Sequence, residues 1–250
     1  MHLGEFRATD KEVKTRAALW CAGLTAVILL VSTAGSILRA AGAAADSSFS
    51  ADKGRFRILQ QNVEAGTEDF SVEPAGNGWL IQGETIIHVS GSAAMRTWGQ
   101  LHVAADGSPQ RYSWSAEGEK KASGSVDFEN GTAKTSATLA GAKQPLLRDF
   151  KFTSPRVAVL DNNLYEQYTV LGRLYDWNAK GKQTFPVLIP QDATPGSIDV
   201  ESIGGTNADG ASLQALRVHS TDLDIQIYFD EKLHLVRLEV PSAKVVIERQ

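Results

Sequence analysis

Cysteine is almost absent from this chain of 250 residues, and its scarcity excludes two kinds of site. The single cysteine, Cys21, lies inside an apolar segment near the N-terminus. The rest of the chain can therefore form neither an internal disulfide nor a thiolate metal site. Small secreted domains often need disulfides because their cores are small. With 42% apolar residues, this chain is long enough to bury a core without them, and we expect one domain.

Several signatures of enzymes and of metal sites are also missing. The sequence contains no P-loop, dinucleotide-binding fingerprint, HExxH helix or GxSxG elbow, which lowers the expectation for those enzyme classes. Metal sites need converging ligands, whereas His88, His102, His219 and His234 are scattered singly along the chain. We expect no metal and no cofactor.

Clusters of basic residues are rare as well. Residues 1–45 carry five basic and three acidic side chains, so 20 basic and 26 acidic residues remain after them. Lys120 and Lys121 form the only basic pair in that remainder. A chain with net negative charge and no basic patch is not expected to bind nucleic acid.

The N-terminal segment has the features of a secretion signal. Lys11, Lys14 and Arg16 precede an apolar stretch at 17–38, and small residues at 40–45 offer A-x-A cleavage patterns. We therefore assign residues 1–45 to a signal peptide, with the mature chain starting near Asp46.

An uncleaved membrane anchor is the alternative for the same segment. As a helix, residues 17–38 would be about 33 Å long, enough to cross the hydrocarbon core of a bilayer. Both alternatives place the following domain outside the cytoplasm, in the periplasm or cell envelope, because the preceding basic residues stay inside. An uncleaved segment would also give the protein a membrane contact. Residues 46–53 are predicted to form a linker and residues 54–250 a single β-rich domain.

Alternating apolar and polar residues predict that this domain is mainly β. In residues 223–229 the apolar side chains at 223, 225, 227 and 229 fall on one face of a strand. Turn sequences at 76–78, 106–107 and 130–131 predict hairpins, and so antiparallel neighbours. Further strands are expected at 184–189, 197–203, 212–219, 233–240 and 244–248.

One stretch, residues 162–176, has helical periodicity instead. Leu164, Tyr168, Leu171 and Tyr175 recur at spacings of four, three and four residues. Asn163 would be the N-cap, with Glu166 completing a capping-box-like start. The predicted fold class is therefore mainly β (α+β): a curved antiparallel sheet, or incomplete β-barrel, enclosing one helix and preceded by an N-terminal signal or anchor helix.

This layout, with a Leu/Tyr-rich segment at 160–168 and terminal strands at 227–241, resembles a known superfamily. It is similar to uncharacterised bacterial envelope proteins of the outer-membrane lipoprotein carrier (LolA/LolB-like) half-barrel superfamily. The resemblance implies an apolar cavity that accepts acyl chains, and it carries over no catalytic residue.

The leading functional hypothesis is a non-enzymatic envelope domain that binds a lipid or other apolar small molecule. Aromatic and leucine side chains on the predicted strands and helix would supply the walls of its pocket. The same side chains would equally form an ordinary core. The ligand-lining candidates are Trp98, Trp114, Tyr165, Tyr168, Leu171 and Tyr228.

Two other hypotheses belong to different classes. A structural or adaptor module would bind an envelope protein partner through a sheet edge or surface patch. A hydrolase would use His234 or the acidic group at Asp222, Asp224, Asp230 and Glu231. The simpler interpretations are a core histidine with a backbone partner, and a solvated strand face and turn.

Overall fold

The computed structural model describes residues 49–88, 91–208, 211–220 and 224–250. The predicted signal peptide or anchor helix, and residues 46–48 of the predicted linker, lie outside the described residues; the rest of that linker is described, and β1 begins within it at Asp52. Among the described residues, no helix is both long enough and apolar enough to cross a bilayer.

The described strands form one sheet of fifteen strands, in the order β8-β7-β6-β5-β4-β3-β2-β1-β15-β14-β13-β12-β11-β10-β9. All neighbours are antiparallel except β9 and β10. The strands are β1 (Asp52–Gln60), β2 (Val63–Ala75), β3 (Gly78–Ile87), β4 (Met95–Ala104), β5 (Pro109–Glu117), β6 (Ala122–Glu129), β7 (Thr132–Leu139), β8 (Leu146–Lys151), β9 (Ala158–Val159), β10 (Gln183–Ile189), β11 (Thr194–Ala208), β12 (Ala211–His219), β13 (Asp224–Phe229), β14 (Leu235–Val240) and β15 (Val245–Arg249).

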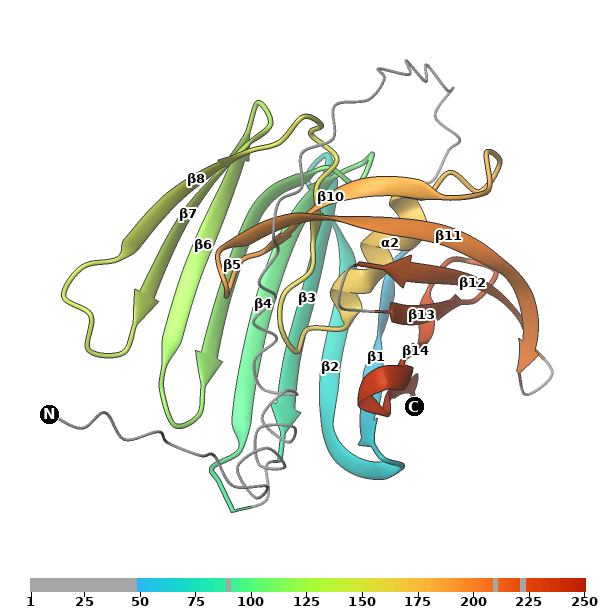
Figure 1. Cartoon of the computed structure of the whole chain (residues 1–250), viewed down its shortest axis with the longest axis horizontal. Coiled ribbons are helices and arrows are strands. Elements are labelled where there is room, and N and C mark those ends of the chain that lie inside the picture. Colours follow the sequence, from blue (N-terminus) through green and yellow to red (C-terminus); the bar gives the residue numbers. More distant parts are fainter. Residues whose placement is uncertain (1–48, 89–90, 209–210, 221–223) are drawn as a thin grey trace, which may run out of the picture.

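The sheet bends around a short helix, α2 (Thr169–Leu174), and does not close into a full barrel (Figure 1). Strands β6 to β8 extend away from α2, to the left in Figure 1. Strands β1 and β15 pair antiparallel, so the two ends of the domain meet within the sheet. The predicted mainly β, curved antiparallel sheet with one enclosed helix is therefore confirmed.

The hairpins follow from residues that tolerate left-handed backbone conformations. Asn130 (φ 50°) and Gly131 (φ 74°) join β6 to β7, as a type I′ turn requires. Gly76 and Gly107 supply positive φ in two earlier turns. Each strand predicted in the second half of the chain corresponds to one of β10 to β15, with ends that differ by a few residues.

The helix is shorter than the predicted span of 162–176, and its start differs. A 3₁₀ turn, η1 (Glu166–Tyr168), leads directly into α2, and Tyr165 precedes it. Asn163 has φ of +60°, so it is not the N-cap, and the predicted capping box is wrong. The carboxylate of Glu68, from β2, takes the place of the local cap by accepting the backbone N–H of Tyr165.

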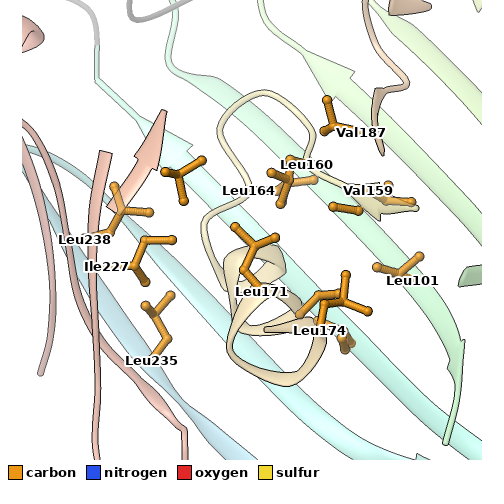
Figure 2. Close-up of a cluster of buried hydrophobic side chains, with 14 of the residues drawn as sticks. Leu101, Val159, Leu160, Leu164, Leu171, Leu174, Val187, Ile227, Leu235 and Leu238 are labelled. Atoms are coloured by element: carbon orange, nitrogen blue, oxygen red, sulfur yellow. The ribbon is translucent and has the colours of Figure 1, made fainter. Parts of the chain in front are cut away.

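The core lies between α2 and the two halves of the sheet. Leu171 and Leu174 of α2 are almost fully buried. Figure 2 shows these two leucines between Leu101 of β4 on one side and Ile227 and Leu235 of the C-terminal strands on the other. The helix therefore joins the N-terminal and C-terminal halves of the sheet into one apolar core.

Two glycines allow this helical segment to approach β3 and β4 closely. A Cβ at Gly83 would lie 2.5 Å from the Glu166 carboxyl, and one at Gly99 would lie 2.5 Å from the side chain of Leu164. Gly83 and Gly99 are direct cross-strand partners. Together they form a shallow depression in the sheet that a larger side chain would fill.

Candidate functional site

The structure separates the six predicted ligand-lining residues into two groups. Trp114 and Leu171 are buried on the inner side of the sheet, and Tyr165 and Tyr168 are half-buried beside them in the helical segment. Burial raises the pKa of Tyr168 to about 12, so its hydroxyl stays neutral. These four side chains belong to the packed core around the helix.

Trp98 and Tyr228 lie on the outer face of the sheet, which corrects their assignment to the lining. In β4 the inner positions are Thr97 and Gly99, and Trp98 lies between them on the opposite face. In β13 the same alternation applies, and the Tyr228 hydroxyl donates to the Gln226 side chain 2.7 Å away. Neither side chain can contact a ligand beside the helix.

An apolar surface does remain open on the inner face of β5 to β8, beyond the end of the covered core. We call it the open apolar wall. Its leucines are exposed, Leu139 by 54% and Leu146 by 46%. The sheet register makes its members contiguous: Ala116 pairs with Ala122, Ala122 with Leu139, and Ala137 with Leu146.

The wall is bordered by one aromatic and one basic residue. The Trp114 indole lies over Gly124, where a Cβ would come within 2.7 Å of its ring nitrogen. Arg148 shares the inner face of β8 with Leu146 and is exposed. The surface therefore presents small and leucine side chains next to an accessible positive charge.

A second feature is a pair of buried carboxyl groups beneath the helical segment. Glu68 of β2 and Glu166 of η1 are 0% and 1% exposed. Burial, followed by the charge of Glu166, raises the pKa of Glu68 well above its usual range, and burial raises the pKa of Glu166. Two buried carboxylates also repel each other, so the state in which both are ionised is disfavoured.

A third buried acid, Asp161, lies next to this pair. Tyr112 donates its hydroxyl to Asp161 at 2.8 Å, and the side-chain carbonyl of Gln167 accepts the Asp161 backbone N–H at 2.7 Å. Burial raises the pKa of Asp161 to about 7, although hydrogen bonds from Gln191, Tyr112 and Asn162 oppose the shift. These groups fix the chain that leads into the helix.

A different polar network lies where the N-terminal segment meets the β13–β14 turn. The Ser50 hydroxyl lies 2.9 Å from Nε2 of His234, and Nδ1 of His234 lies 3.0 Å from the Asp230 carboxylate. Arg173 of α2 donates one N–H to the Ser50 hydroxyl at 3.3 Å and to the Lys232 carbonyl at 2.6 Å. A serine, a histidine and an aspartate are thus linked in series beside a guanidinium.

The predicted acidic group does not form one site. Asp230 contacts His234, but Asp224 instead pairs with Arg217 on the outer face, and this pair lowers the pKa of Asp224. Glu231 is exposed, and Asp222 lies outside the described residues. Of the predicted hydrolase residues that the structure describes, only His234 and Asp230 contact each other.

Sequence reasoning missed Ser50, Arg173 and Glu68. Ser50 fell within the predicted linker, yet its neighbour Phe49 is 4% exposed and β1 already begins at Asp52. A large aromatic residue, Phe49, beside the serine within the predicted linker was the one available signal. Glu68 lies on the same face of β2 as the buried residues Phe70 and Val72, so the strand alternation was the signal that could have marked it as buried.

A polar depression on the outer face of β10 to β12 was also absent from the predictions. Its lining residues are Lys182, Asp199, Glu201, Arg217 and His219. Lys182 and Thr184 both bind the Asp199 carboxylate, and Arg217 is bound to Asp224. Because these charges largely satisfy one another, the depression gives no indication of a ligand.

Comparison with known proteins supports the fold. No family model matches the chain, and no curated protein matches it. A solved structure described as a β-barrel-like protein of domain of unknown function DUF1849, from Brucella abortus, is similar with a TM-score of 0.55 and 9% identity over 81% of this chain and 96% of that one. A DUF1089 family protein from Pseudomonas aeruginosa aligns with a TM-score of 0.41 and 11% identity, over 86% of this chain and 97% of that one. The first similarity shows a β-barrel-like fold, whereas membership of the lipoprotein carrier superfamily stays a prediction.

Proposed function

We propose that this protein is an exported envelope domain that binds an amphipathic ligand, with its apolar chain against the open apolar wall. The observation that carries the proposal is the exposure of Leu139 (54%) and Leu146 (46%) on the concave side of the sheet. The resemblance to lipoprotein carriers and the N-terminal leader are consistent with that role.

The apolar contribution to the free energy of binding can be estimated from the exposure of the two leucines. Fully burying a leucine side chain contributes about 1.5–3 kcal/mol, so covering two half-exposed leucines would contribute about 2 kcal/mol. The neighbouring alanines and the edge of Trp114 add further apolar contact. Millimolar binding already needs about 4 kcal/mol, so these further apolar contacts and a polar contact to the ligand must supply the remainder.

The accessible charge of Arg148 indicates the chemistry of the ligand's polar end. Arg148 lies two residues from Leu146 on the same face of β8. A guanidinium binds carboxylate and phosphate groups through parallel hydrogen bonds. The favoured ligand is therefore an anionic amphiphile, such as a fatty acid, and not a neutral oil.

Substitution of the wall leucines tests the proposal. Leu139→Ser and Leu146→Ser should each weaken binding of a fluorescent fatty acid about three- to tenfold, because each removes apolar contact worth about 1 kcal/mol. Arg148→Gln should weaken binding of the fatty acid but not of the corresponding alcohol. Titration by fluorescence gives the dissociation constants.

Leu147→Ser is the matched control, because Leu147 is on the same strand, is 68% exposed and faces outward. It should leave the affinity unchanged. Equal affinities for the parent protein and the wall variants, or parent protein that never takes up the fatty acid, would refute the proposal.

A second candidate, an adaptor that pairs with a protein partner, is favoured by the edge of the sheet. Strand β8 ends the sheet, and most of its residues are exposed, whereas β9 at the other end is fully buried. An exposed edge can accept another strand. Crosslinking in cells would support the adaptor if a partner is captured by the parent but lost with Leu147→Lys, and its absence in both would refute it.

A further inference from the structure

The polar network at Ser50 has the connectivity of a nucleophile, a base and an orienting acid. Ser50 lies 2.9 Å from Nε2 of His234, and Nδ1 of His234 lies 3.0 Å from Asp230. Both distances are normal hydrogen-bond lengths. A serine hydroxyl, an imidazole and a carboxylate in this order form the arrangement that activates serine in hydrolases on unrelated folds.

The surrounding hydrogen bonds set the direction of each proton. The Asp230 carboxylate can only accept, so in the neutral imidazole of His234 the hydrogen is on Nδ1 and Nε2 presents its lone pair to Ser50. Arg173 donates an N–H to the Ser50 oxygen, so that oxygen is an acceptor for Arg173 and its own hydrogen is available for another acceptor. The carbonyl of Lys232 lies 3.5 Å from that hydroxyl, farther than His234. The proton of Ser50 therefore points to the base.

The histidine is held by the turn in which it lies. The same Asp230 carboxylate accepts the backbone N–H groups of Lys232 at 2.9 Å and of His234 at 2.8 Å. Leu233, between them, has φ of +60°, which closes the turn tightly. The aspartate thus fixes both the backbone and the ring of His234.

The serine is held from the opposite side. Phe49, its neighbour, is 4% exposed, lies 5.9 Å from the Trp79 ring and has the Arg173 guanidinium 5.5 Å above it. Arg173 itself is 7% exposed. A buried positive charge beside the Ser50 oxygen favours the loss of the Ser50 proton to His234. Ser50 is half-buried, and the side chains of His234 and Asp230 are 15% and 37% exposed. The three residues, which we call the relay, therefore border solvent.

We propose that Ser50 is a catalytic nucleophile, with His234 as general base and Asp230 as its orienting acid, in the hydrolysis of carboxylic esters. This activity goes beyond the ligand binding proposed above and does not depend on the open apolar wall.

The reaction balances without any further reagent. The Ser50 oxygen bonds to the ester carbonyl carbon while its proton passes to Nε2 of His234. The alcohol then leaves with that proton, and an acyl-serine remains. Water, deprotonated by His234, attacks the acyl carbon; the carboxylic acid is released and the proton returns to the Ser50 oxygen.

A fluorophosphonate probe tests the nucleophile on the full chain. It should label the parent protein, and mass spectrometry of peptides should place the adduct on Ser50. That localisation needs no variant, so it holds even where a substitution impairs folding. Absence of an adduct, or an adduct on another residue, would overturn the proposal.

Variants then separate catalysis from a merely structural tether. Hydrolysis of p-nitrophenyl acetate should be lost in Ser50→Ala and should fall at least a hundredfold in His234→Gln and at least tenfold in Asp230→Asn. Ser123→Ala and His102→Gln are matched controls on outer strand positions and should keep the parent rate.

If the network only fastens the N-terminal segment, melting temperatures would fall in the relay variants while labelling and hydrolysis stayed at background in every protein. Binding of a fatty acid at the wall, measured in the same proteins, is expected to be unaffected.

Discussion

The buried pair of Glu68 and Glu166 shows how one residue can complete a helix that is almost a hundred positions away in sequence. A helix leaves its first backbone N–H groups without partners. The Glu68 carboxylate accepts the N–H of Tyr165 at 3.0 and 3.1 Å and that of Glu166 at 3.4 Å. The strand supplies the cap that the local sequence lacks, and it ties the helical segment to β2.

Removing this cap should therefore be costly. Glu68→Ala should lower the free energy of unfolding by about 2–4 kcal/mol, because buried N–H groups lose their acceptor and a cavity forms. Glu84→Gln is the control: Glu84 is 42% exposed on the outer face, where its ion pair with Arg96 contributes less than about 1 kcal/mol. Urea denaturation measures both, and similar values would contradict the capping role.

Individual side chains also show where the sequence was informative. The apolar alternation at 225, 227 and 229 already places Tyr228 on the outer face, so that correction could have been made from the strand pattern alone. Trp98 was harder, because its inner neighbours in β4 are Thr97 and Gly99. A small polar residue and a glycine occupy the inner face there because the helical segment needs the space.

At the scale of elements, the helical segment packs closely against β3 and β4 because glycines at the contact carry no side chain. The pair Gly83 and Gly99 accepts the Glu166 carboxyl and Leu164. Hydrophobic periodicity was sufficient to predict that a helix exists near 162–176. Its true start depends on Glu68, a distant contact that no local pattern encodes.

Adding one methyl group should test this fit. Gly99→Ala should destabilise the domain by about 1–3 kcal/mol, because its Cβ would lie 2.5 Å from the Leu164 side chain and 3.1 Å from the Tyr112 hydroxyl. Gly205→Ala, in β11, is the matched control: its nearest neighbour would be 3.5 Å away, so we expect little change or slight stabilisation. Thermal unfolding of both variants makes the comparison, and equal melting temperatures would show that the helix tolerates the extra atom.

At the scale of the whole molecule, the fold was predictable because one local pattern, a strand followed by a hairpin turn, recurs along the chain. Alternating apolar and polar residues, separated by hairpin turns, predict an antiparallel meander. The apolar inner face of such a sheet must be covered, and here the helix covers it. The networks at Ser50 and Glu68 were not predictable, because both join segments separated by a large part of the chain. Patterns within short windows cannot identify such partners.

Buried acids should give the whole domain a characteristic pH dependence. The pKa of Asp161 is about 7 in the folded state, above its ordinary value of 3.8, so folding takes up a proton between those values. Its contribution to stability is complete below about pH 4 and is lost as the pH rises towards 7, by up to about 1.4 kcal/mol per pH unit. The stability of the parent relative to Asp161→Asn should therefore fall with increasing pH over that range.

Tyr112→Phe gives a second check on the same titration. It removes a hydrogen bond that holds the Asp161 pKa down, so the loss of stability should extend to higher pH. Denaturant unfolding between pH 4 and 8 measures both curves. A constant difference between the parent and Asp161→Asn would rule out proton uptake at this residue.

The pairing of β1 with β15 has a consequence for how the protein is made. Ile58 in β1 lies opposite Ile247 in β15, so the seam between the two halves of the sheet cannot form until β15 has emerged from the ribosome. Until then the nascent chain lacks its closing strand, and long-range pairing of this kind is slow. Until β15 pairs with it, the edge of β1 stays open to other strands, including those of neighbouring nascent chains.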